Sequence, residues 1–190
     1  RYKSSYLCSG LINHTDGVGP LVLLFHLMPF EIERKFLVTG EFRDQAYNCT
    51  HIRQGYICSG NGRTVRVRIR DDKGYLTIKG PSGEEGLKRY EFEQEISLSD
   101  AEDLMTICKP GIIDKNRYLV RCGKHVFEVD EFFGENEGLV IAEVELQSED
   151  EAYEKPDFIG REVTGDRRFY NAHMRKNPFC LWKDELKDIL

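Results

Sequence analysis

The sequence lacks the patterns that mark several common classes of protein. None of its six cysteines lies in a CxxC pair, so nothing supports a zinc knuckle or a thioredoxin-like motif. Its five histidines show no spacing typical of metal ligands, and the chain contains no internal repeat or low-complexity tract. Because disulfide frameworks are uncommon in domains of this size, we expect reduced cysteines and a cytoplasmic protein.

The sequence also has no long hydrophobic run. Its most apolar stretch, GPLVLLFHLM at residues 19–28, is far shorter than the about 20 residues that a membrane span needs. No small-residue cleavage site of a secretory signal follows it. We therefore expect no membrane partner, and we interpret residues 1–28 as an N-terminal extension, non-native or disordered. The alternative is a native strand that pairs at a sheet edge.

The composition is that of an ordinary globular protein. The chain has 190 residues, of which 40% are hydrophobic and 32% charged, enough for one domain with a sizeable core. The formal net charge of −6 argues against a generic nucleic-acid binder, so we expect no nucleic-acid partner.

After Met28 the pattern is mostly that of β-strands. FEIERKFLV at residues 30–38 and TVRVRIR at 64–70 alternate apolar and charged residues, so each strand presents one charged face. Helices are predicted from Ser99, where Glu102 completes a capping box, from Ser148 to before Pro156, and over residues 181–190. The expected class is α+β, an antiparallel sheet with flanking helices.

The charges on these strands are sorted by sign. Acidic pairs occur at Glu31/Glu33, Glu91/Glu93, Glu128/Asp130 and Glu143/Glu145, and basic pairs at Arg66/Arg68 and Lys115/Arg117, with single lysines at Lys35 and Lys79. Like charges two residues apart repel by about 2 kcal/mol at an effective dielectric of 20. The simplest interpretation is a solvated outer face. Repetition of one sign on many strands instead favours a charged interior.

Carboxylates and basic side chains together indicate a particular chemistry. Mg²⁺ and Mn²⁺ prefer hard oxygen ligands, and phosphates are bound by arginine and lysine. A site with both suits a metal–polyphosphate complex. If the sheet curls into a barrel with its apolar face outward under helices, the charged face lines a tunnel.

These residues resemble those of the CYTH superfamily, the triphosphate tunnel metalloenzymes. EIERKF at residues 31–36 is similar to the family's ExExK signature. The similarity continues through RVRIR at 66–70, YEFEQEI at 90–96, KNRY at 115–118, FEVDEF at 127–132, AEVEL at 142–146 and VTGDRRFYN at 163–171. The resemblance implies a closed antiparallel eight-stranded β-barrel, a tunnel with a polar charged interior, over residues 29–190.

The resemblance also implies roles for individual residues. The phosphate-binding set would be Lys35, Arg66, Arg68, Lys79, Lys115 and Arg117. The metal-binding set would be Glu31, Glu33, Glu91, Glu93, Asp130, Glu143 and Glu145. The catalytic residues would be Glu31, Glu33, Lys35, Glu91 and Glu93, with Mg²⁺ or Mn²⁺ as cofactor.

The expected function is hydrolysis of inorganic triphosphate, because the short chain resembles the bacterial-type triphosphatases of that family. Three alternatives stay open: a thiamine triphosphate or nucleoside triphosphate hydrolase, a class IV adenylyl cyclase, and a non-catalytic polyphosphate or nucleotide sensor. The expected partner is a small phosphorylated substrate, and the expected oligomeric state is a monomer or homodimer.

Overall fold

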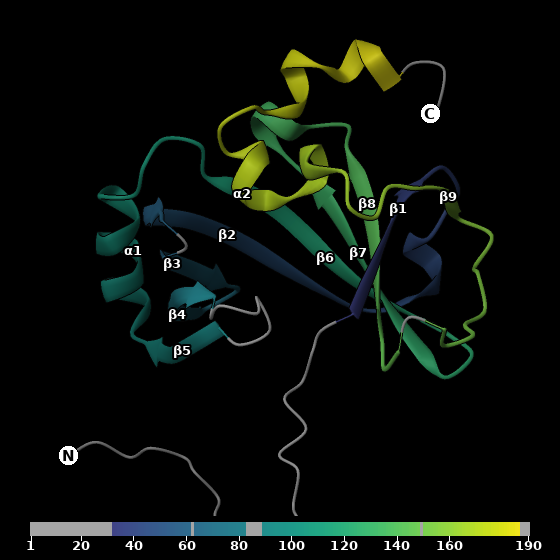
Figure 1. The fold of residues 1–190 in the computed structure, drawn as a ribbon, viewed down its shortest axis with the longest axis horizontal. Helices are drawn as coiled ribbons and strands as arrows, with labels where there is room; N and C mark the ends of the chain where they lie inside the picture. The colour runs from purple at the N-terminus through teal and green to yellow at the C-terminus, as the bar shows by residue number, and fades with distance from the viewer. Residues whose placement is uncertain (1–31, 62, 83–88, 149, 187–190) are drawn as a thin grey trace, which may run out of the picture.

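The computed structural model describes residues 32–61, 63–82, 89–148 and 150–186, and they form one large sheet with short helices (Figure 1). Expectations about residues 1–28, Glu31 and residues 187–190 lie outside this range. The strands are β1 (Ile32–Val38), β2 (Ala46–Gly60), β3 (Arg63–Arg70), β4 (Lys73–Ser82), β5 (Arg89–Ile96), β6 (Ile113–Cys122), β7 (His125–Phe132), β8 (Val140–Leu146) and β9 (Ile159–Glu162).

The sheet has the order β5-β4-β3-β2-β6-β7-β8-β1-β9, and every pairing is antiparallel. It is strongly curved, so that β3, β4 and β5 lie at one end and β1, β8 and β9 at the other (Figure 1). This curvature turns one face inward and places distant strands around a common space.

The expected closed, eight-stranded barrel is not what the described residues form: the sheet has nine strands and is open. The reason lies in the pairing of β1. One side of β1 pairs with β8, and the other pairs with β9, a strand of only four residues. Where β9 pairs with β1, at Phe36 and Val38, both edges of β1 are used, and β5 and β9 form the two edges of the described sheet.

The alternating residues separate onto two faces as predicted. On β3, Val67 and Ile69 are buried on the outer face, where Ala101 of α1 (Leu98–Thr106) packs against them. The neighbouring positions Arg66 and Arg68 therefore point to the inner, concave face. The helix expected from Ser99 is present, but it begins at Leu98, and its N-cap is Ser97, whose hydroxyl accepts a hydrogen bond from Asp100 N at 3.0 Å.

Two apolar clusters occupy different faces of the second half of the sheet. On the outer face, Phe36, Phe127 and Val144 belong to a core that includes Phe42 and Phe158. The inner face is not charged throughout, which corrects the expectation that the apolar face points only outward. Its apolar end is covered by the C-terminal segment, in the cluster Leu37, Ile113, Phe132, Leu139, Ile141, Val163, Phe169, Met174, Phe179, Trp182 and Leu186.

Two of the predicted helices are wrong. Residues following Ser148 form a turn, in which Glu151 N donates to Ser148 O at 3.1 Å and the Glu151 carboxylate accepts from Gln147 N. The described part of 181–190 forms 3₁₀ turns at Phe179–Leu181 and Lys183–Leu186, because Trp182 and Leu186 turn inward to pack. The only other α-helix described is α2 (Asn171–Met174).

Two further features bear on the environment of the protein. None of the helices among the described residues is long and apolar enough to span a membrane. The five cysteines within the described ranges are free thiols, and Cys8 lies outside them.

Candidate functional site

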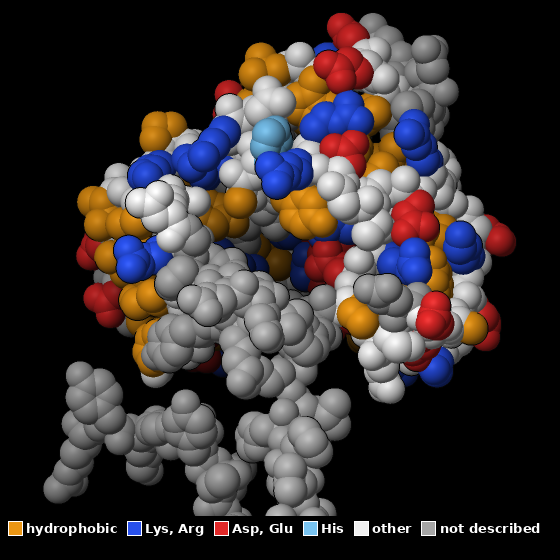
Figure 2. All heavy atoms as spheres, viewed as in Figure 1, with side chains coloured by type: hydrophobic (Ala, Val, Ile, Leu, Met, Phe, Trp, Pro, Cys, Tyr) orange, Lys and Arg blue, Asp and Glu red, His pale blue; other side chains and the backbone are white. Residues whose placement is uncertain are grey.

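The concave face contains a cavity of about 550 Å³ near the centre of the molecule. Figure 2 shows a hollow there in which acidic and basic side chains are visible. Its lining residues are Glu33, Lys35, Tyr56, Arg66, Arg68, Lys79, Glu93, Arg117, Glu128, Glu143, Glu145, Tyr170, Asn171 and Ala172. Five of these are basic and five acidic, and they come from both ends of the curved sheet.

The basic wall comes from β3 and β4, which bring Arg66, Arg68 and Lys79 to the cavity. Arg66 donates to the buried hydroxyl of Thr77 at 3.1 Å and contacts Glu93 at 3.3 Å. Thr77 in turn donates to Glu93 at 2.7 Å. Partial burial raises the pKa of Glu93, but the Thr77 bond and the nearby arginines outweigh it and lower the pKa overall. Glu93 therefore stays ionised and holds Arg66 in place.

The acidic wall comes from β1, β7 and β8. Glu33 lies directly opposite Glu145 in the β1–β8 pairing, and Glu128 lies directly opposite Glu143 in the β7–β8 pairing. Like charges at directly opposed positions destabilise a sheet unless cations compensate them. Burial and the Glu143 charge raise the pKa of Glu33, and hydrogen bonding and attraction from Lys35 only partly offset them.

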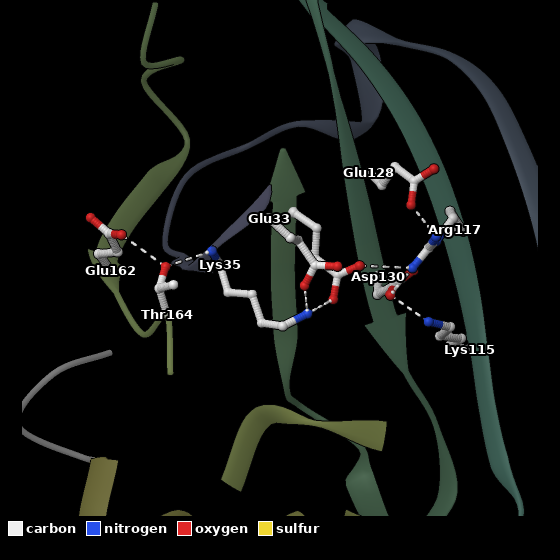
Figure 3. A network of polar contacts seen from close by, with 9 residues as sticks. Glu33, Lys35, Lys115, Arg117, Glu128, Asp130, Glu162 and Thr164 are labelled. Atoms are coloured by element: carbon white, nitrogen blue, oxygen red, sulfur yellow. Dashed lines mark hydrogen bonds and ion pairs between the residues drawn. The ribbon is translucent and has the colours of Figure 1, made fainter. Parts of the chain in front are cut away.

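Lys35 provides much of that compensation. Its side chain is 6% exposed, and its ammonium group contacts the carboxylate of Glu33 (Figure 3). The same ammonium group also contacts the carboxylate of Glu143. It also lies 5.1 Å from the ring centroid of Tyr170. Burial lowers the pKa of Lys35, but the two carboxylates outweigh this and raise it overall, so the ammonium stays charged. The Lys35 backbone N–H donates to Thr164 Oγ1 at 3.0 Å, which fixes this part of β1.

Arg117 of β6 joins the acidic wall to a buried ion pair. Its guanidinium donates to Asp130 Oδ1 at 2.7 Å and Oδ2 at 2.6 Å, contacts Glu143 Oε2 at 3.1 Å, and contacts Glu128. Behind it, Lys115 contacts the same Asp130 (Figure 3), and both of these side chains are 1% exposed. Burial raises the pKa of Asp130, but the two cations outweigh it and lower the pKa overall.

The predicted site residues separate into three groups. Most line the cavity, including five of the six predicted phosphate-binding residues. Lys115 and Asp130 do not line it, because they lie at the boundary with the apolar cluster of the C-terminal segment. Glu31 and the side chain of Glu91 lie outside what the structure describes, although Glu91 is placed opposite Lys79 in the β4–β5 pairing.

The sequence pattern did not identify every lining residue. Tyr56 and Tyr170 lie in the wall, and Asn171 and Ala172 belong to α2, which lies between the two ends of the sheet (Figure 1). Their positions depend on the packing of Phe169 and Met174 into the apolar cluster. The sequence signal that could have identified Tyr170 and Asn171 was the stretch VTGDRRFYN, which matches the family pattern.

A smaller cavity of about 260 Å³ shares the acidic wall. It is lined by Glu33, Lys124, His125, Val126, Glu128, Glu143 and Glu145. The four glutamates therefore border both cavities. The acidic wall is accessible from the larger cavity, on the side of the basic wall, and from the smaller cavity, on the side of the β6–β7 hairpin.

The donor set determines which metal would suit this site. Carboxylate oxygens are the ligands that Mg²⁺ and Mn²⁺ prefer. Among the described residues, no three His, Cys, Asp or Glu side chains are grouped closely enough to hold a metal ion. Mg²⁺ is commonly bound by one or two carboxylates together with substrate phosphates, so the acidic wall fits an ion that arrives with its polyphosphate.

The antiparallel sheet and its charged concave face place this protein in a class suited to bind polyanions. Comparison with known proteins gives the family. The model of the CYTH domain matches residues 29–170, and the chain belongs to the CYTH domain family.

Relatives with known names agree with this assignment. An inorganic triphosphatase of Acetivibrio thermocellus is 46% identical over 155 residues, covering 81% of this chain and 98% of the relative. An inorganic triphosphatase of Nitrosomonas europaea is 35% identical over 145 residues, covering 74% of this chain and 93% of the relative. The crystal structure of an inorganic triphosphatase superposes with a TM-score of 0.63 at 32% identity, covering 78% and 95% of the two chains.

Proposed function

We propose that the protein is an enzyme that hydrolyses inorganic triphosphate with the help of a divalent metal ion. The observation that carries this proposal is the cavity of about 550 Å³, in which a basic wall faces an acidic wall. Two relatives that cover most of the chain are named inorganic triphosphatases. The cavity offers a polyphosphate and its metal ion complementary charges on opposite sides.

The basic wall would bind the phosphate chain. Arg66, Arg68 and Lys79 present donors from neighbouring strands, and Arg117 lies between them and the acidic wall. Guanidinium groups bind phosphate oxygens in a bidentate manner and neutralise the charge that builds up on the transferring phosphoryl group. These residues would bind and orient the substrate, while Asp130 and Lys115 would hold Arg117 from behind.

The acidic wall would supply the metal ligands and the base. Glu143 and Glu145 would hold Mg²⁺ or Mn²⁺ together with phosphate oxygens. The bound ion would polarise those oxygens and neutralise part of their charge. The raised pKa of Glu33 makes its carboxylate a better proton acceptor than an ordinary glutamate, so Glu33 would take the proton of the attacking water.

The remaining features of the proposal concern the whole chain. We infer that residues 29–190 act as one domain, that the concave face serves as a tunnel when substrate is bound, and that the protein acts in the cytoplasm as a monomer or homodimer. Two cavities meet at the acidic wall, and this supports the tunnel. A ligand between the two walls would be accessible from both cavities.

Phosphate release from a panel of substrates tests the activity. The protein is incubated with Mg²⁺ or Mn²⁺ and, separately, inorganic triphosphate, thiamine triphosphate, ATP and pyrophosphate. We expect phosphate release from triphosphate to far exceed the rest and to stop when EDTA is added. Cyclic AMP formed from ATP would establish a cyclase instead, and tight triphosphate binding without turnover would establish a sensor.

A further inference from the structure

Gln54 is a fully buried polar residue next to the basic wall. It lies on β2, directly opposite Arg68 of β3. The Gln54 amide oxygen accepts a hydrogen bond from Arg68 Nε at 3.3 Å, and its amide nitrogen lies 3.4 Å from the hydroxyl of Tyr56. A buried amide with this geometry restrains the guanidinium of Arg68 from the neighbouring strand β2.

Arg68 differs from three of the other basic residues with which it shares the cavity. Lys35 contacts Glu33 and Glu143, and both Arg66 and Arg117 contact carboxylates within 4.0 Å. Among the side chains that the structure describes, no carboxylate oxygen lies within that distance of the Arg68 guanidinium. The side chain that orients Arg68 is therefore neutral.

The charges closest in effect to Arg68 are mostly positive. Burial, together with the charges of Arg66, Arg117 and Arg70, outweighs the opposing charge of Glu93 and lowers the pKa of Arg68 to about 10, which still leaves the group protonated at neutral pH. A buried cation among cations and without an ion pair is stabilised by an anion from outside. A carboxylate in the place of Gln54 would satisfy Arg68 internally and compete with that anion.

We propose that Gln54 is a positioning residue that directs Arg68 toward triphosphate while leaving it without an ion pair. This inference rests on the proposed function. A matched substitution to glutamate keeps the shape of the side chain and adds a charge, whereas methionine keeps its approximate volume and removes both hydrogen bonds. The wild-type protein should bind triphosphate more tightly than either Gln54 variant.

The test measures triphosphate binding and turnover in Gln54→Glu and Gln54→Met. The dissociation constant of inorganic triphosphate is measured by calorimetry without metal, and KM and kcat are measured with Mg²⁺. We expect Gln54→Glu to weaken binding and raise KM about tenfold or more, with a smaller change in kcat. Gln54→Met should weaken binding about threefold to tenfold, the effect of one or two hydrogen bonds.

Two controls separate positioning from a purely structural role. Gln94→Glu adds the same charge at an exposed site of β5 that does not line the cavity, and it should leave KM unchanged. In an Arg68→Met background, Gln54→Met should have no further effect on binding, because its effect acts through Arg68.

The outcomes distinguish this inference from the proposed function. If the wild-type protein neither binds nor hydrolyses triphosphate, both are overturned. If the wild type does both and the two Gln54 variants keep its dissociation constant and KM, the inference alone is overturned. The inference would also be overturned if Gln54→Met weakened triphosphate binding equally in the wild-type background and in the Arg68→Met background.

Discussion

At the scale of single residues, the acidic wall has a cost in stability. Glu33 and Glu145 lie directly opposite each other, and Glu143 lies near both Lys35 and Arg117. Glu33 is a half-buried carboxylate with a raised pKa, so its ionised form is disfavoured by its surroundings. Strain of this kind is common at sites adapted to bind a ligand that relieves it.

Glu33→Gln should abolish activity and stabilise the metal-free protein. We expect phosphate release from triphosphate to fall by about 10²-fold or more, as for the loss of a general base or a metal ligand. Because folding raises the pKa of Glu33, its ionisation reduces stability as the pH rises above the ordinary glutamate value of about 4.3. The variant should therefore have a higher Tm than the wild type at pH 8, and the difference should vanish below pH 4.

The control for this prediction is Glu137→Gln, an exposed position outside the cavity that should change neither activity nor Tm. Turnover that survives in Glu33→Gln would remove this residue from the mechanism. A lower Tm at pH 8 would show that its contact with Lys35 outweighs the burial of its charge.

At the scale of elements, β6 and β7 are joined by a buried charge cluster. Directly opposed positions in this pairing include Arg117 with Asp130 and Lys115 with Phe132. Asp130 accepts from both basic residues and is 1% exposed, so it orients Arg117 toward the cavity. Removing one member of such a cluster leaves an uncompensated buried charge, which is more damaging than replacing the pair.

Asp130→Asn should therefore lower the free energy of unfolding by about 3–5 kcal/mol at pH 7. The pKa of Asp130 is lowered by folding, so its contribution is complete above the unfolded value of about 3.9 and is lost as the pH falls toward the folded value. Urea unfolding at pH 7 and pH 3 measures this difference, which should shrink at the lower pH.

The double variant Lys115→Met with Asp130→Leu serves as the comparison. It should be more stable than Asp130→Asn, because no buried charge is left unpaired behind Arg117. If Asp130→Asn were as stable as the wild type, or if the double variant were the least stable, the cluster would not hold the two strands as described.

The alternation of residues along the strands predicted which face of the sheet each side chain occupies. The alternation of Arg66 and Arg68 with Val67 and Ile69 identified the faces of β3, because residues two apart share a face on any strand. How deeply a side chain is buried cannot be predicted from this alternation. Lys115 and Arg117 share a face, but only Arg117 borders the cavity, because the C-terminal segment covers the position of Lys115. That contact joins segments far apart in the sequence and leaves no periodic signal.

The same reasoning explains the errors in the elements. The predicted helix after Ser148 depended on a capping pattern, but the Glu151 carboxylate instead accepts hydrogen bonds from Lys124 and Gln147 N. The eight-strand closure was implied by resemblance and not by pattern. The four-residue β9 pairs with β1 and forms one edge of the described sheet, which is open.

At the scale of the whole molecule, the C-terminal segment determines the shape of the site. Trp182 packs edge to face with Phe169 and Phe179, at centroid distances of 5.4 and 5.0 Å, inside the apolar cluster of the concave face. Its indole N–H donates to Asn177 O at 3.1 Å. This segment therefore bounds the cavity and supports α2, which presents Asn171 and Ala172.

Trp182→Ala should destabilise the protein by about 3–5 kcal/mol, because it removes a buried aromatic side chain. The adjacent Leu181 is 70% exposed, and Leu181→Ala should change the free energy of unfolding by less than about 0.5 kcal/mol. Urea unfolding of both variants measures the contrast. Equal effects would show that the segment does not pack into the concave face.

The central claim is that the basic and acidic walls hold a metal–triphosphate complex between them. A crystal structure of the protein with Mn²⁺ and inorganic triphosphate, with anomalous scattering used to locate the ion, tests this claim most directly. The account predicts phosphates on Arg66 and Arg68 and a Mn²⁺ peak beside Glu143 and Glu145. Phosphates or Mn²⁺ bound outside the concave face, with this cavity empty, would contradict it.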